Sequence, residues 1–209
     1  MFKFNLLLLA LLTSSLCGFA QSDVFNSDKS ITFLGIDYSH VQFVGPVSGW
    51  GEETTKSPKE IKDTYYILWN NTIEREPQNF KFAEAVNRSK VEIHTKSVQK
   101  ANEGGKTDHL FVDNESEAET ISEKDIAGMI KKYDLPKSGD IGMVLICEQI
   151  NKNSKSATYW VNFIDLNSGK LLLSKKVIGD GGGFGFKNYW LGSVKSVLKQ
   201  MKKEFKSWK

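Results

Sequence analysis

The sequence predicts a single α/β domain in which helices pack on a mixed sheet of four to six strands. Three observations predict this class: an early strand-like segment at 31–38, an unbroken apolar run at 141–150, and a C-terminal hairpin followed by a long helix. The length of 209 residues suits one domain. A hydrophobic content of 40% and a charged content of 25% allow a core without disulfide support.

The sequence of the N-terminal part of the domain predicts a strand, a loop and a helix. Residues 31–38 are rich in branched and aromatic side chains, which favours a strand that resumes at 41–44. Residues 45–56 contain glycine, proline, serine and threonine without periodicity and predict a long loop. A helix is expected to begin after Ser57, because Ser57 can cap it and Glu60 can complete a capping box.

The middle of the chain predicts shorter elements. Residues 80–88 indicate a short helix and residues 91–95 an alternating strand. The polar stretch 102–120 predicts a loop with a short strand at 109–112. A second capping sequence opens a helix over residues 122–133.

The C-terminal part carries the clearest patterns. Residues 141–150 predict a central strand, because their apolar side chains follow one another without alternating with polar ones. Residues 157–165 and 170–178 flank an Asn-Ser-Gly turn and predict a hairpin. The glycine-rich segment 179–185 then precedes a helix at 188–207, whose apolar side chains fall on one side and whose lysines fall on another.

The first twenty residues predict a cleaved export signal. Lys3 provides a positive start, and residues 6–12 form an apolar run too short to span a bilayer. Small residues at Gly18 and Ala20 suit signal peptidase, so residues 21–209 form the predicted domain. Leu16 before Cys17 does not fit lipoprotein processing, which favours a soluble periplasmic or extracellular protein over a lipoprotein.

Composition and motifs argue against several kinds of chemistry. The formal charge of +3 is too small to indicate nucleic-acid binding. Cys147 lies inside an apolar run, which indicates a small buried side chain rather than a nucleophile. The sequence contains no nucleotide-binding motif, nucleophile elbow or compact metal spacing, so we predict no cofactor, no metal and no catalytic residue.

Two resemblances concern the second half of the chain. The segments IGMVLICEQINK, YWVNFIDLNSGK and GGGFGFKNYW resemble a set of uncharacterised exported proteins of Bacteroidota-type bacteria, a resemblance that implies no chemistry. The order of elements is loosely similar to the small α/β domain of TolB N-terminal and CsgG-like envelope proteins, and Asp165, Ser168, Gly169 and Lys170 match the hairpin turn of those proteins. The second resemblance implies a docking or assembly module.

Two loops, and the start of the helix that follows the second loop, supply the candidate binding residues, because aromatic side chains beside glycines can form a platform for a sugar ring or for a partner's side chain. These residues are Trp50, Glu52, Gly181, Gly182, Gly183, Phe184 and Tyr189. The alternative is that the glycines only allow a tight strand-to-helix reversal, which lets Phe184 and Phe186 turn inward.

These features favour an exported, non-catalytic protein that binds an envelope or secreted protein partner. A small-ligand or glycan-binding protein that uses the same aromatic residues is the first alternative. The second is a hydrolase, and its acid and base would come from among Asp37, His40, Glu52 and His109.

Overall fold

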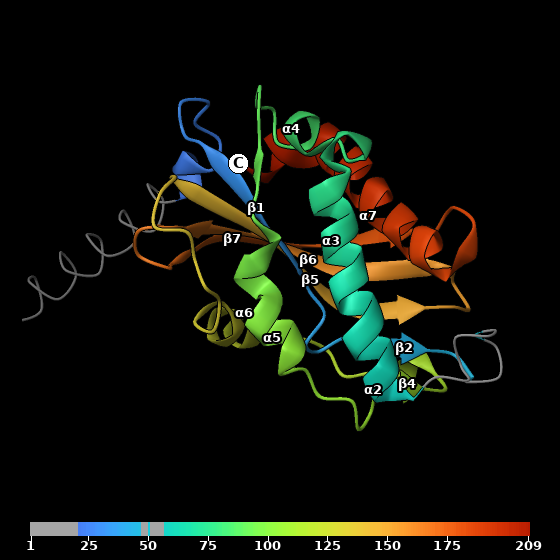
Figure 1. Cartoon of the computed structure of the whole chain (residues 1–209). Helices are drawn as coiled ribbons and strands as arrows, with labels where there is room; N and C mark the ends of the chain where they lie inside the picture. Colours follow the sequence, from blue (N-terminus) through green and yellow to red (C-terminus); the bar gives the residue numbers. More distant parts are fainter. Residues whose placement is uncertain (1–20, 47–49, 51–56) are drawn as a thin grey trace, which may run out of the picture.

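The computed structural model describes residues 21–46, 50 and 57–209, and it shows helices packed on one mixed sheet of seven strands (Figure 1). The strands are β1 (Ile31–Asp37), β2 (Gln42–Val44), β3 (Glu92–Ile93), β4 (Phe111–Val112), β5 (Ile141–Asn151), β6 (Ser156–Asp165) and β7 (Leu171–Asp180). The predicted α/β class is confirmed. The sheet has seven strands rather than four to six, and β3 and β4, which lie within the short strands expected at 91–95 and 109–112, have two residues each.

Strand β5 organises the sheet. Its first part pairs in parallel with β1, where Ile31 lies opposite Ile141, and its last residues pair in parallel with β2, where Val44 lies opposite Asn151. Strand β6 runs antiparallel along the other edge of β5, and β7 lies outside β6. All eleven residues of β5 are buried, as its unbroken apolar run predicts.

Helices cover both faces of this sheet (Figure 1). The first face carries α2 (Pro58–Ile61), the π-helix η2 (Lys62–Tyr66), α3 (Ile67–Arg75), α4 (Phe82–Ala85) and α7 (Gly185–Glu204). The second face carries the 3-10 helix η4 (Thr95–Val98), α5 (Gln99–Glu103) and α6 (Glu123–Ile130). Three further 3-10 helices are η3 (Pro77–Asn79), η5 (Glu115–Glu117) and η6 (Phe205–Trp208).

Both predicted capping boxes form. The Ser57 hydroxyl accepts the Glu60 N–H, and the Glu60 carboxylate accepts the Ser57 N–H at 2.7 Å. Ser122 and Asp125 make the same exchange at the start of α6. The first helix then continues through the π-helical segment to Arg75, two residues before Pro77, so local signals set both of its ends.

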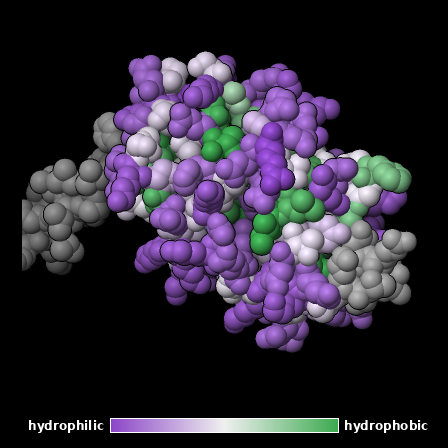
Figure 2. Space-filling view, in the orientation of Figure 1, coloured by the Kyte–Doolittle hydropathy of each residue, from purple (hydrophilic) through white to green (hydrophobic). Residues whose placement is uncertain are grey.

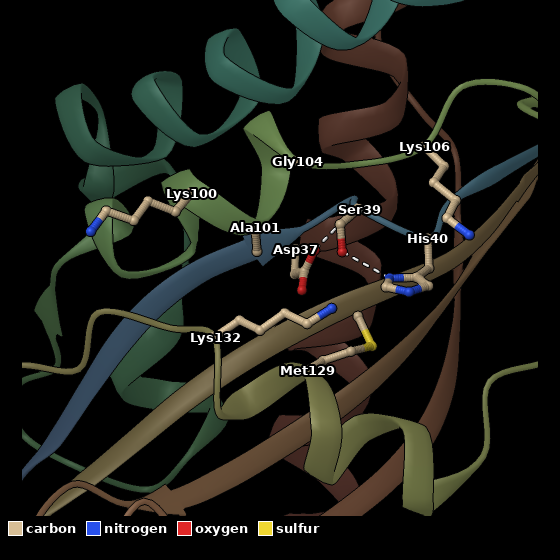
Figure 3. Close-up of a pocket in the computed structure, with 9 residues that line it drawn as sticks. All are labelled: Asp37, Ser39, His40, Lys100, Ala101, Gly104, Lys106, Met129 and Lys132. Carbon is tan, nitrogen blue, oxygen red and sulfur yellow. Dashed lines mark hydrogen bonds between the residues drawn. The ribbon is translucent and has the colours of Figure 1, made fainter.

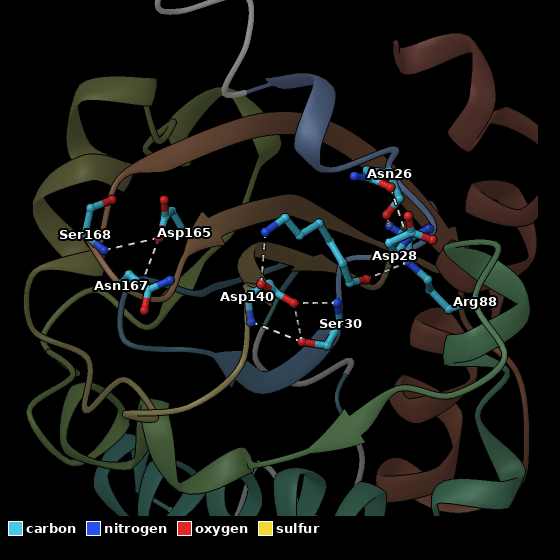
Figure 4. A network of polar contacts seen from close by, with 9 residues as sticks. Asn26, Asp28, Ser30, Arg88, Asp140, Asp165, Asn167 and Ser168 are labelled. Atoms are coloured by element: carbon cyan, nitrogen blue, oxygen red, sulfur yellow. Dashed lines mark hydrogen bonds and ion pairs between the residues drawn. The ribbon is translucent and has the colours of Figure 1, made fainter.

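The hairpin and the closing helix also match the prediction. The Asp165 carboxylate accepts the backbone N–H groups of Asn167 at 2.8 Å and Ser168 at 3.2 Å, which fixes the turn between β6 and β7 (Figure 4). Helix α7 begins at Gly185, three residues earlier than predicted, and its buried side chains, among them Trp190 and Val194, close the first face.

Cys147 lies in the middle of β5 and is fully buried. Burial raises the pKa of its thiol well above the ordinary value, so the thiol stays protonated near neutral pH. This confirms the predicted role as a small core side chain. None of the helices in the described parts of the chain is both long and apolar enough to cross a membrane.

Candidate functional site

Trp50 belongs to the predicted loop 45–56 and Tyr189 to the helix that follows the glycine-rich segment, and the structure places them in one pocket of about 290 Å³. The pocket is lined by Trp50, Lys152, Lys155, Gly185, Phe186, Tyr189 and Trp190. It lies where the parallel strands β2 and β5 end and where α7 begins. The carboxyl edge of parallel strands is where open α/β sheets bind ligands.

Trp50 forms a packed wall of this aromatic pocket. Its side chain is only 5% exposed, and its indole N–H donates to the Gly45 carbonyl at 3.1 Å. Its ring lies 5.3 Å from the ring of Phe43 and 5.8 Å from the ring of Trp190. Trp50 is therefore anchored in the first-face core and presents one side to the pocket, rather than extending freely from a loop.

The glycines of the neighbouring loop allow close packing on α7. A side chain at Gly181 would overlap the Tyr189 ring, and Gly183 has a φ of +123° with the Asn188 carbonyl 2.9 Å from the position of a Cβ. Gly182 donates its N–H to the Tyr189 carbonyl at 2.9 Å. These contacts support the tight strand-to-helix reversal that the sequence left as an alternative.

The two phenylalanines of this loop have opposite environments. Phe186 packs inward, 4.7 Å from the ring of Tyr65 and 5.8 Å from the ring of Trp69. Phe184 is 93% exposed, so the expectation that both rings turn inward is wrong for Phe184. Gly183 and Gly185, both with positive φ, flank Phe184 and direct the backbone there away from the core. Figure 2 shows a hydrophobic projection over this loop on a largely hydrophilic face.

Two lysines give the aromatic pocket a positive rim. Lys152 and Lys155 lie in the turn between β5 and β6, and the Lys152 ammonium is 5.8 Å from the centroid of the Trp50 ring. Neither lysine forms an ion pair with any residue that the structure describes. The sequence did not identify them, because lysines in a polar turn are usually solvated surface residues. Aromatic walls and a cationic rim suit an apolar group that carries a carboxylate.

Of the hydrolase candidates that the structure describes, Asp37, His40 and His109 are not hydrogen-bonded to one another. Asp37 and His40 line a second cavity, described below, but the Asp37 carboxylate accepts hydrogen bonds from the Ser39 N–H at 2.7 Å and the Tyr133 hydroxyl at 2.6 Å. His40 instead contacts the Ser39 hydroxyl through Nδ1 at 2.8 Å. His40 and His109 together line an adjacent hollow, and Glu52 lies outside the described residues.

Among residues 21–46, 50 and 57–209, no three His, Cys, Asp or Glu side chains are grouped to hold a metal ion. Comparison with protein-family models, with curated proteins and with solved structures found no match for this chain.

Proposed function

We propose that this protein is exported, is non-catalytic and binds an envelope or secreted protein partner through the aromatic pocket. The observation that carries the proposal is the convergence of Trp50 and of Tyr189 in α7, which lie far apart in the sequence, on one pocket of about 290 Å³. Export follows from the predicted signal segment at 1–20. The exposed Phe184 beside the pocket adds apolar surface of the kind that protein interfaces bury.

The chemistry of the pocket indicates what part of a partner it would hold. Its aromatic walls suit a buried anchor side chain, which is typical of the centre of a protein interface. Lys152 and Lys155 favour a carboxylate next to that anchor. Helix α7 starts at the same pocket without a side-chain cap and without an acidic residue in its first turn, which also favours negative charge there. The expected partner segment therefore combines an aromatic or branched residue with an acidic group.

The test is a cross-linked pull-down of tagged mature protein from its native envelope, read by mass spectrometry. The pocket variant combines Phe184→Ser with Lys155→Glu, and the matched control combines Ile178→Ser with Lys199→Glu. All four positions are exposed, so neither variant removes core packing. We expect one stoichiometric partner with the wild type and the control, and its loss with the pocket variant. Retention of the partner by the pocket variant would contradict the proposed site.

A thermal-shift screen separates this function from the glycan-binding alternative. A ligand that binds only the native state raises the unfolding midpoint. The proposal predicts stabilisation by aromatic carboxylates such as N-acetylphenylalanine, and a smaller effect of the uncharged amide, because the lysine rim has no charge to pair with. Stabilisation by neutral sugars that is lost in Tyr189→Ala would instead favour glycan binding.

A further inference from the structure

A second cavity, of about 200 Å³, lies at the end of β1 and is distinct from the aromatic pocket. It is lined by Asp37, Ser39, His40, Lys100, Ala101, Gly104, Lys106, Met129 and Lys132. We propose that this cavity, which we call the lysine cavity, binds a small dianionic oxyanion: inorganic phosphate or sulfate, or a simple phosphate monoester.

The course of the chain creates this crevice. Strands β1 and β3 are parallel neighbours. After β1 the chain passes through β2 to α2 and α3 on the first face, whereas after β3 it enters η4 and α5, where Val98 packs in the core of the second face. Between β1 and β2 the chain stays in the sheet, because both strands pair with successive parts of β5. The lysine cavity lies at this interruption, beyond the carboxyl end of β1, and residues of α5 and α6 close it on the second-face side. Ligands of open α/β sheets bind beyond the carboxyl ends of the strands.

The charge of the cavity selects an anion. Lys100, Lys106 and Lys132 line it, and none of them forms an ion pair with a residue in the described part of the chain. Figure 3 shows the Lys132 ammonium near Asp37 and the Lys106 ammonium near His40, whereas the Lys100 ammonium points away from the other residues drawn. The single carboxylate, Asp37, is fully buried and already accepts two hydrogen bonds. Among the lining residues, the ammonium groups of Lys106 and Lys132 therefore outnumber the one carboxylate, that of Asp37. Lysines act as point charges for phosphate groups.

Neutral polar groups complete the lysine cavity. The Ser39 hydroxyl and the His40 Nδ1 contact each other at 2.8 Å, which leaves His40 Nε2 as the ring nitrogen able to meet a ligand. The volume of about 200 Å³ is below that of pockets for drug-sized ligands, so it suits an ion or a short ester. More than one ammonium group at one cavity favours a dianion over a monoanion.

The test is an NMR titration of the full mature protein at low ionic strength with inorganic phosphate, sulfate, glycerol phosphate and acetate. The cavity variant is Lys106→Gln with Lys132→Gln. The control, Lys199→Gln with Lys203→Gln, removes the same charge from exposed positions of α7. Loss of two charge-assisted contacts should raise the dissociation constant for phosphate by about tenfold or more in the cavity variant, and by less than about threefold in the control.

The location and the selectivity of binding provide the other readouts. We expect saturable shifts of the Ser39 and His40 amides, and binding of acetate about tenfold weaker than that of phosphate because acetate carries one charge. Tighter binding of glycerol phosphate than of phosphate would identify the ester as the preferred form. Absence of saturable shifts with phosphate and sulfate, equal weakening in the two variants, or equal affinity for acetate would each overturn the proposal. The partner experiment uses other residues, so the two proposals fail independently.

Discussion

At the scale of single residues, two charged side chains hold the segment that leads into β1. The Arg88 guanidinium donates to five backbone carbonyls, those of Val24, Asn26, Lys29, Val86 and Asn87. The Asp140 carboxylate accepts the N–H and the hydroxyl of Ser30, each at 2.9 Å, and lies 3.2 Å from the Lys29 ammonium (Figure 4). Side chains thus provide the hydrogen bonds that strand pairing does not supply there.

Replacing Arg88 with lysine should destabilise the protein. A lysine ammonium has fewer donors and lacks the planar fork that reaches several carbonyls at once, so at least two carbonyls lose their partner. We expect the free energy of unfolding to fall by about 2–3 kcal/mol, measured by urea denaturation. Arg75→Lys is the matched control, because Arg75 is exposed at the end of α3. A loss of similar size in Arg75→Lys would mean that the carbonyl contacts are not the cause.

The Asp140 contacts predict a pH-dependent contribution to stability. The Ser30 N–H, then the Ser30 hydroxyl and Lys29, hold the pKa of Asp140 below its ordinary value of 3.8. A carboxylate whose pKa is lowered on folding stabilises the native state above the unfolded-state pKa, and this contribution is lost as the pH falls through the lower native-state pKa. Asp140→Asn should therefore cost about 1 kcal/mol near pH 7, a value reduced by solvent exposure.

Urea denaturation of wild type and Asp140→Asn at several pH values tests this prediction. The difference between the two should be constant near neutral pH, should begin to shrink below pH 3.8, where the unfolded-state carboxylate takes up its proton, and should vanish below the lower native-state pKa. Asp180→Asn, an exposed position at the end of β7, serves as control. A difference that does not change with pH would show that Asp140 acts through packing rather than through charge.

At the scale of elements, the approach of α7 to the glycine-rich loop shapes the aromatic pocket. Side chains at Gly179 and Gly192 would overlap the backbone of Ser193 and Gly182, respectively. These glycines let the strand, the loop and the helix lie in direct backbone contact. Tyr189 and Phe186 are held at the pocket by this contact, so the shape of the pocket depends on residues that do not line it.

A pair of glycine-to-alanine substitutions separates helix propensity from packing. Gly192 lies in α7 against the loop, whereas Gly128 lies in α6, where, apart from its chain neighbours and the adjacent backbone of its own helix, no atom of the described residues comes within 4 Å of the position that a Cβ would take. Gly128→Ala should stabilise the protein by about 0.5–1 kcal/mol, because alanine is the better helix former. Gly192→Ala should destabilise it by about 1–3 kcal/mol, because overlap outweighs that gain. Thermal unfolding measures the stability of both variants. A stabilised Gly192→Ala would show that the loop moves to accommodate the added methyl group at no cost in free energy.

At the scale of the whole molecule, β5 connects every layer. It pairs with β1 and β2 on one edge and with β6 on the other, and its side chains enter both hydrophobic clusters. Its backbone can become exposed only when both sheet halves separate. The two-residue strands β3 and β4, by contrast, lie at the margin of the sheet.

Native-state hydrogen exchange should reflect this arrangement. We expect the amides of β5 to exchange most slowly, with a protection free energy equal to that of global unfolding, and those of β3 and β4 to exchange through local opening. Residue-resolved exchange followed by NMR measures both sets in one sample. Protection of β3 equal to that of β5 would contradict this view and would mean that the sheet opens only as a unit.

The sequence predicted those parts of the fold that depend on neighbouring residues. Short segments of sequence specify four features of the fold: the capping boxes at Ser57 and Ser122, the turn after Asp165 and the apolar side of α7. It did not predict α5 or the π-helical segment at 62–66, which lack a local signal. It also could not show that Glu148, inside an apolar run, is buried and paired with Lys176 at 2.8 Å, because that contact crosses β6.

The sequence by itself determined the class of fold, the main strands and helices, and the two loops that carry aromatic side chains. Only the tertiary structure decided that Trp50 and Tyr189 share a pocket, that Phe184 faces solvent, and which lysines lie beside each cavity. The physical reason is that local propensities act over a few residues, whereas the order of strands around β5 decides which distant loops meet. Sites formed at strand ends depend on that order.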